Sequence, residues 1–108
     1  MNLATIREDL KEIRYYYTKK KMFDEAFECT GQSEIIQKVK KYNEMIVFAP
    51  IKLYELYHSL YIKNHTQESL SEELCYTPEY VQMLHKQLLK FLQSRFAQLE
   101  GYNVWFFR

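Results

Sequence analysis

Glycine and proline are scarce in this chain, with two residues of each among 108. Tight turns between strands depend on these residues, so their scarcity disfavours a protein built from sheets. Apolar residues instead recur at spacings of three and four, which is the period of an amphipathic helix. We therefore expect an all-α fold. A chain of this length with 47% hydrophobic residues can bury one modest core, as expected for a single domain.

Cysteines and long apolar runs are also few. Two cysteines, Cys29 and Cys75, do not make a disulfide scaffold, and we expect free thiols in a reducing cytoplasm. No segment approaches the ~20 apolar residues of a membrane span, and the first ten residues lack the apolar core of a signal peptide. The sequence therefore predicts a soluble, cytoplasmic protein without membrane segments.

Patterns typical of catalysis and metal binding are lacking as well. The three histidines and two cysteines show none of the close, paired spacings of zinc ligands. The chain has no nucleophile motif, no glycine-rich phosphate loop and no histidine with an evident acidic partner. We expect neither enzyme activity nor a metal or other cofactor.

The net charge of +1 neither indicates nor excludes nucleic-acid binding. From Thr66 onward, however, five acidic residues outnumber four basic ones. Non-specific affinity for DNA comes largely from the neutralisation of phosphates by lysine and arginine. The charge balance of this half therefore disfavours strong DNA binding by that half alone.

Three helices are expected before Thr66. The apolar positions of the first follow a 3-4-3-4 spacing and are Leu3, Ile6, Leu10, Ile13 and Tyr17. They predict one long helix over residues 3–28, packed on its own domain or forming the seam of a homodimer. Gly31 ends this helix, and Ser33 can cap the second. Pro50 ends the second helix and opens the third, since the residue before a proline is driven out of the helical region.

Residues 66–86 predict two short helices joined by a turn. Thr77 is a good N-cap, Pro78 suits the first helical position, and Ser71 is small where the two helices cross. The apolar positions are Leu70, Leu74, Tyr76, Val81, Leu84 and Leu88. This pattern is typical of a helix-turn-helix, which places its second helix in the DNA major groove.

The last helix is expected to run from Pro78 to Gly101, which ends it. We thus divide the chain into N-terminal helices (1–49), a helix-turn-helix region (50–99) and an aromatic tail (100–108). The tail contains Trp105 and three other aromatic residues after Gly101, and such side chains are an aggregation hazard in water. We expect them to be buried against the first helix, a second subunit or a partner protein.

Residues 56–70 read Leu-Tyr-His-Ser-Leu-Tyr-Ile-Lys-Asn-His-Thr-Gln-Glu-Ser-Leu, and residues 71–74 read Ser-Glu-Glu-Leu. Together with the Lys-Gln-Leu-Leu-Lys-Phe-Leu stretch at 86–92, they resemble region 4 of the sigma-70 family. They are especially similar to the short phage and mobile-element activators of the ArpU and RinA type. The resemblance covers residues 50–96 and implies binding of promoter-like double-stranded DNA, with RNA polymerase as a possible partner.

Two departures from the family pattern stand out. The family has glycine, often at positive φ, where this chain has Cys75. The family's arginine-rich recognition helix is replaced by one whose residues include Glu79, Tyr80, Gln82 and Met83.

The helical period assigns roles to the recognition residues if Val81, Leu84 and Leu88 point inward. Gln82 can then pair with adenine and Glu79 with cytosine N4, while Met83 can contact a thymine methyl group. Lys86 can reach guanine or a phosphate. Contacts that position the DNA backbone are expected from Thr66, Gln67, Thr77 and Lys90.

A second interpretation uses the same fold for a different partner. The acidic balance after Thr66 and the aromatic tail favour a protein-interaction module that binds RNA polymerase, a sigma factor or another regulator. The helix-turn-helix pattern favours the DNA-binding regulator.

Overall fold

The computed structural model describes residues 2–31 and 33–106, and for residues 100–106 it describes the backbone alone. This part of the chain contains six α-helices, one π-helical turn and no strand, so the all-α expectation is confirmed. The elements are α1 (Leu3–Thr18), α2 (Lys20–Thr30), α3 (Glu34–Ile46), α4 (Ile51–Tyr57), η1 (His58–Ile62), α5 (Gln67–Leu74) and α6 (Pro78–Phe106).

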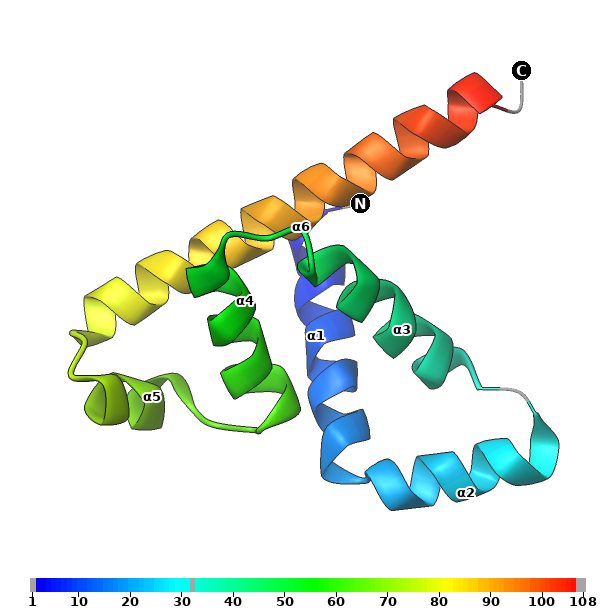
Figure 1. Cartoon of the computed structure of the whole chain (residues 1–108), viewed down its shortest axis with the longest axis horizontal. Helices are drawn as coiled ribbons and strands as arrows, with labels where there is room; N and C mark the ends of the chain where they lie inside the picture. Colours follow the sequence, from blue (N-terminus) through cyan, green and yellow to red (C-terminus); the bar gives the residue numbers. More distant parts are fainter. Residues whose placement is uncertain (1, 32, 107–108) are drawn as a thin grey trace.

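The helices form two groups with α1 lying between them (Figure 1). On one side of the molecule, α1, α2 and α3 follow one another around a triangle. On the other side, α4, η1, α5 and the first half of α6 do the same. The C-terminal part of α6 extends beyond all the other helices (Figure 1).

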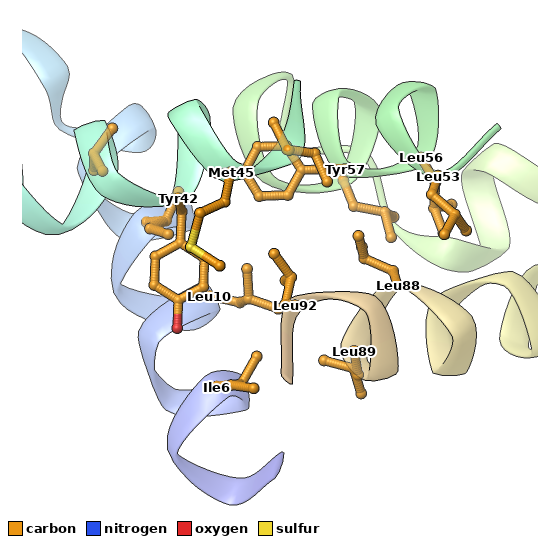
Figure 2. Close-up of a cluster of buried hydrophobic side chains, with 14 of the residues drawn as sticks. Ile6, Leu10, Tyr42, Met45, Leu53, Leu56, Tyr57, Leu88, Leu89 and Leu92 are labelled. Carbon is orange, nitrogen blue, oxygen red and sulfur yellow. The ribbon is translucent and has the colours of Figure 1, made fainter. Parts of the chain in front are cut away.

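One core joins the two groups where α1, α3, α4 and α6 meet. Ile6, Leu10 and Ile13 of α1 are 0–1% exposed. Figure 2 shows two of them, Ile6 and Leu10, in one cluster with Tyr42, Met45, Leu53, Leu56, Tyr57, Leu88, Leu89 and Leu92. The expectation that the first helix packs on its own domain is confirmed. These three residues are covered within the chain, and a homodimer stays a prediction.

The prediction of one long helix over residues 3–28 is wrong. The chain bends at Lys19 (φ −118°, ψ 32°), and α2 leaves α1 in a new direction (Figure 1). The bend places the Phe23 ring 5.7 Å from Tyr15 and 5.9 Å from Tyr16. The Tyr16 hydroxyl also donates to Asp24 at 2.7 Å.

Several helix boundaries follow the expected capping residues. The Ser33 and Thr77 hydroxyls accept from the backbone N–H groups three residues ahead, at 3.3 and 3.2 Å. Gly31 ends α2 with a left-handed backbone (φ 70°), and Pro50 immediately precedes α4. Ser33, Pro50 and Thr77 therefore stand at helix starts as predicted, and Gly31 stands at a helix end. The prediction that Pro50 also ends the second helix is wrong, because α3 already ends at Ile46.

Gly101 does not end the last helix, contrary to expectation. The backbone of α6 stays helical to Phe106. A glycine inside a helix costs only about 1 kcal/mol, and no proline follows to stop the helix. The predicted burial of the tail aromatics concerns side chains that lie outside the described residues.

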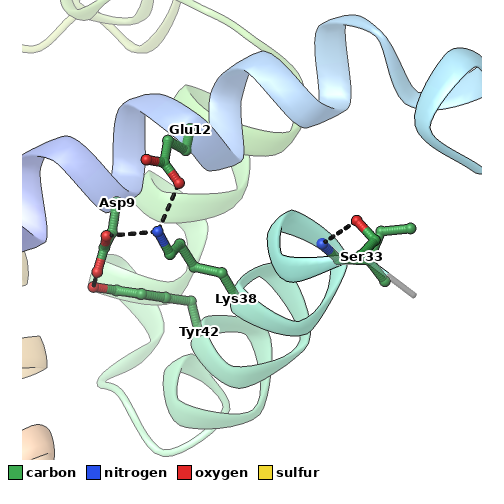
Figure 3. Close-up of polar contacts among 6 residues, drawn as sticks. Asp9, Glu12, Ser33, Lys38 and Tyr42 are labelled. Carbon is green, nitrogen blue, oxygen red and sulfur yellow. Dashed lines mark hydrogen bonds and ion pairs between the residues drawn. The ribbon is translucent and has the colours of Figure 1, made fainter. Parts of the chain in front are cut away.

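A polar cluster joins α1 to α3 beside the core (Figure 3). The Tyr42 hydroxyl donates to Asp9 Oδ2 at 2.6 Å, and Lys38 Nζ lies 3.1 Å from Asp9 Oδ1 and 2.6 Å from Glu12 Oε2. Asp9 is only 8% exposed. Burial and the bond to Asp9 raise the pKa of Tyr42, so its hydroxyl keeps the proton that it donates.

Candidate nucleic-acid interface

A three-residue turn, 75–77, connects α5 to α6. Thr66 caps α5 by accepting from the Ser69 N–H at 3.0 Å, as Thr77 caps α6. Cys75 adopts the left-handed conformation (φ 57°, ψ 31°). The turn therefore has the backbone that glycine favours, with a cysteine in its place.

Ser71 stabilises this turn through two hydrogen bonds to Tyr76. Its side chain is buried, its hydroxyl donates to the Tyr76 carbonyl at 2.5 Å, and the Tyr76 N–H donates to the Ser71 carbonyl at 3.0 Å. The sequence predicted only that a small residue was needed at this position. The structure adds a polar function for its hydroxyl, which fixes the path from α5 to α6.

The first half of α6 has one buried and one exposed side. Val81, Leu84 and Leu88 are 0%, 6% and 0% exposed, as predicted. The exposed residues of the opposite side include Glu79, Gln82, Met83, Lys86 and Lys90. None of these five side chains makes a hydrogen bond or ion pair with another described residue. Together they form a surface, here called the α6 face, that is free to contact a partner.

Tyr80 differs from the α6 face because it turns toward α4. It is half-buried, and its hydroxyl accepts from Lys52 Nζ at 3.1 Å. That hydrogen bond raises the pKa of Lys52. The Tyr80 ring also meets the Tyr76 ring edge-on, with centroids 4.9 Å apart. The structure therefore separates Tyr80 from the other candidate residues of the recognition helix.

The residues predicted to contact the DNA backbone lie at two places. Thr77 begins α6 beside the α6 face, whereas Thr66 and Gln67 stand at the start of α5. Helix α5, with eight residues and a length of about 12 Å, lies between the two places along the chain. Thr66 and Thr77 are exposed and Gln67 is half-buried.

The expected apolar stripe of α5 and its turn is only partly buried. Leu70 is 3% exposed, but Leu74 and Tyr76 are 48% and 37% exposed, which corrects the prediction for both. The reason is that α5 packs against α6 and leaves a space toward α4. A pocket of about 240 Å³ occupies that space. Its lining combines apolar and charged residues: Lys52, Glu55, Leu56, Ser59, Lys63, His65, Leu70, Glu73, Leu74, Tyr76, Val81 and Leu84.

The contact of α1 with this region was not predicted from the sequence. Arg14 Nη2 donates to the carbonyls of Asn64 and His65, at 3.3 and 3.4 Å. The Asn64 side chain in turn donates to Thr18 Oγ1 at 3.0 Å. These bonds join α1 to the loop that leads into α5. No local sequence pattern could reveal them, because the partners are about 50 residues apart.

A half-buried tyrosine–histidine pair joins η1 to α6. The Tyr61 hydroxyl and His85 Nε2 are 2.5 Å apart. Burial raises the pKa of Tyr61 to about 12. Burial and the nearby Arg7 charge lower the pKa of His85 from its ordinary value of 6.5, so this imidazole is neutral at pH 7.

Other kinds of site find little support in the described residues. Cys29 and Cys75 are exposed and unpaired. No three His, Cys, Asp or Glu side chains of residues 2–31 and 33–99 gather as metal ligands would. Nor does any described helix combine the length and apolarity that crossing a membrane requires.

Comparisons with models of protein families, with curated proteins and with solved structures found no match.

Proposed function

We propose that this chain is a sequence-specific regulator that binds promoter-like double-stranded DNA through α5, the 75–77 turn and α6. This is the function implied by its resemblance to sigma-70 region 4 and to the ArpU and RinA activators of phages and mobile elements. One observation carries the proposal: the five side chains of the α6 face are exposed and make no hydrogen bond or ion pair with another described residue. The helix that carries them is held to the core by Val81, Leu84 and Leu88.

The chemistry of the α6 face suits recognition of base edges. Gln82 can form a bidentate pair with adenine, Glu79 can accept from cytosine N4, and Met83 can contact a thymine methyl group. Lys86 and Lys90 supply positive charge for guanine or phosphate. Thr66 and Thr77 add hydroxyls at two helix N-termini, where the helix dipole favours phosphate.

The test is fluorescence anisotropy of the protein with pooled duplex fragments from its own genome, at about 50 and 200 mM salt. We expect binding that weakens with salt but persists for a subset of fragments. The double variant Gln82→Ala/Lys86→Glu should lose this preference while keeping the wild-type circular dichroism spectrum. No binding by the folded wild type at the lower salt would reject the proposal.

The pocket between α4, α5 and α6 favours a second candidate function, a protein-interaction module. Leu74 and Tyr76 stand exposed beside the pocket, and its lining has both apolar and charged residues. Such a mixture suits an amphipathic segment of RNA polymerase, a sigma factor or another regulator.

The variant Leu74→Asp/Tyr76→Ser separates the two candidates. Both residues are exposed, so the fold should tolerate the changes. If the module binds polymerase through the pocket, this variant should lose polymerase in a pull-down with the purified enzyme. The Gln82→Ala/Lys86→Glu variant should retain it. If the α6 face binds DNA, Gln82→Ala/Lys86→Glu should lose DNA binding in the anisotropy assay and Leu74→Asp/Tyr76→Ser should retain it.

A further inference from the structure

The charged residues of α1 are divided between two sides of the helix. Arg7, Lys11 and Arg14 are spaced i, i+4 and i+7, so they form one strip, here called the α1 strip. Asp9 and Glu12 lie on the other side, where both contact Lys38 of α3. Lys38 thus balances one of these two negative charges within the fold, while the α1 strip carries three positive charges on the opposite side.

The α1 strip lies beside the DNA-binding elements proposed above. At one end, Arg14 binds the carbonyls of Asn64 and His65, directly before Thr66 and α5. At the other end, α1 packs against α6, and the charge of Arg7 helps to lower the pKa of the half-buried His85 on that helix. Seven residues of helix rise about 10 Å. The strip thus runs from the loop before α5 toward the side of α6 that carries His85.

The side chains of the strip are available to a ligand. Arg7 is exposed and makes no ion pair with another described residue. Lys11 meets Glu8 at 3.3 Å, but these side chains are 75% and 69% exposed. A pair so open to water holds Lys11 only weakly. Arg14 is half-buried and retains guanidinium N–H groups beyond the Nη2 group that binds the loop.

We propose that the α1 strip binds the phosphate backbone of double-stranded DNA next to the groove that α6 enters. This inference rests on the proposed function. It accounts for how a helix-turn-helix half with more acids than bases binds a polyanion: the neutralising charge comes from α1. The strip makes no contact that distinguishes bases, so it contributes affinity and orientation rather than sequence preference.

The test compares three variants in salt titrations against a preferred duplex selected from the genomic pool. Arg7→Ala/Lys11→Ala removes the two exposed charges and spares Arg14, whose bonds support the fold. Lys21→Ala/Lys40→Ala is the matched control, because it removes two exposed lysines that have no partner among the described residues. Gln82→Ala changes the α6 face alone. Circular dichroism confirms the fold of each.

We expect Arg7→Ala/Lys11→Ala to reduce the slope of log affinity against log salt by about 2, because each phosphate contact contributes about 0.9. Its ranking of genomic fragments should stay unchanged. Gln82→Ala should alter the ranking and keep the slope. If Arg7→Ala/Lys11→Ala has the same slope as Lys21→Ala/Lys40→Ala, the proposed phosphate contacts of the α1 strip are wrong, while DNA binding by α6 is unaffected. Absence of DNA binding by the wild type would overturn both proposals.

Discussion

Cys75 illustrates how a single residue can keep a turn at a cost in stability. It and Asn64 are the non-glycine residues at positive φ in the described chain, with φ of 57° and 61°. Asparagine adopts this conformation readily, whereas cysteine pays a steric penalty of about 1 kcal/mol. The 75–77 turn is therefore held by its surroundings, including the two bonds between Ser71 and Tyr76.

Cys75→Gly should raise the free energy of unfolding by about 1 kcal/mol, since glycine adopts this conformation without a clash. Urea denaturation followed by circular dichroism measures the change. Cys75→Ala is the control, because it removes the thiol and retains the clash of a Cβ atom. Equal stabilities of the glycine and alanine variants would show that the turn is not strained.

His85 should make the stability of the protein depend on pH. Its pKa is lowered in the folded state from 6.5, so the unfolded chain takes up the proton first as the pH falls. The stabilising contribution is complete above pH 6.5 and is lost as the pH falls from there toward the folded-state pKa. Urea denaturation at a series of pH values between about 7.5 and 5 should show this loss.

His85→Gln should flatten the dependence in that window. Glutamine can still bond to the Tyr61 hydroxyl but does not titrate. His58 and His65 remain in the variant and contribute equally to both proteins. A pH dependence identical to that of the wild type would assign the effect to groups other than His85.

Among the helices, the contact between α1 and α3 depends on a polar cluster as well as on the core. Asp9→Ala should lower the free energy of unfolding by about 2 kcal/mol, because it removes the carboxylate that accepts a hydrogen bond from the buried Tyr42 hydroxyl. Lys38 also loses one of its two partners. Thermal and urea denaturation measure the effect.

Glu12→Ala provides the comparison for Asp9. Its side chain is 51% exposed, so loss of its ion pair to Lys38 should cost less than about 0.5 kcal/mol. Equal costs for the two substitutions would mean that the Tyr42–Asp9 bond contributes little.

The helices themselves were largely predictable, and their directions were not. Apolar spacing and the capping residues Ser33, Thr77 and Pro50 identified helix starts, because these signals are local. The bend at Lys19 was not predicted. It brings the Phe23 ring against the rings of Tyr15 and Tyr16, and such tertiary contacts leave no signal in the local apolar spacing. Gly101 was given too much weight, since its helical penalty is small.

The candidate site was predictable in part for the same reason. The period of α6 correctly separated Val81, Leu84 and Leu88 from the exposed α6 face. It could not reveal that Tyr80 turns toward Lys52, nor that Leu74 stays exposed where α5 stands away from α4. Both depend on how α4, α5 and α6 are placed in space, which no spacing within one helix encodes.

At the scale of the whole molecule, the two helical groups share one core. Leu92 of α6 is fully buried among residues of that core, with Leu10, Tyr42 and Met45 shown around it in Figure 2. The N-terminal helices are therefore part of the structure that supports the α6 face. We expect the groups to unfold together, in a single transition.

Leu92→Ala should lower the free energy of unfolding by about 2–5 kcal/mol through the cavity it creates, and unfolding should remain one transition. Circular dichroism and tyrosine fluorescence report on the helices and on the packing of the rings. Leu99→Ala, at a position 38% exposed on the same helix, should change stability by less than about 0.5 kcal/mol. Separate transitions for the two probes would show that the groups fold independently.

The lack of buried residues in α2 has a consequence for local opening. None of its eleven residues is fully buried, and it is held mainly by Phe23 and by the Tyr16–Asp24 bond. Its amide hydrogens should exchange with solvent through local unfolding. Those of α6 near Leu88 should exchange only when the whole molecule unfolds. A protease would cut first within α2, and the two fragments would stay together through the core that α1 and α3 share with α6.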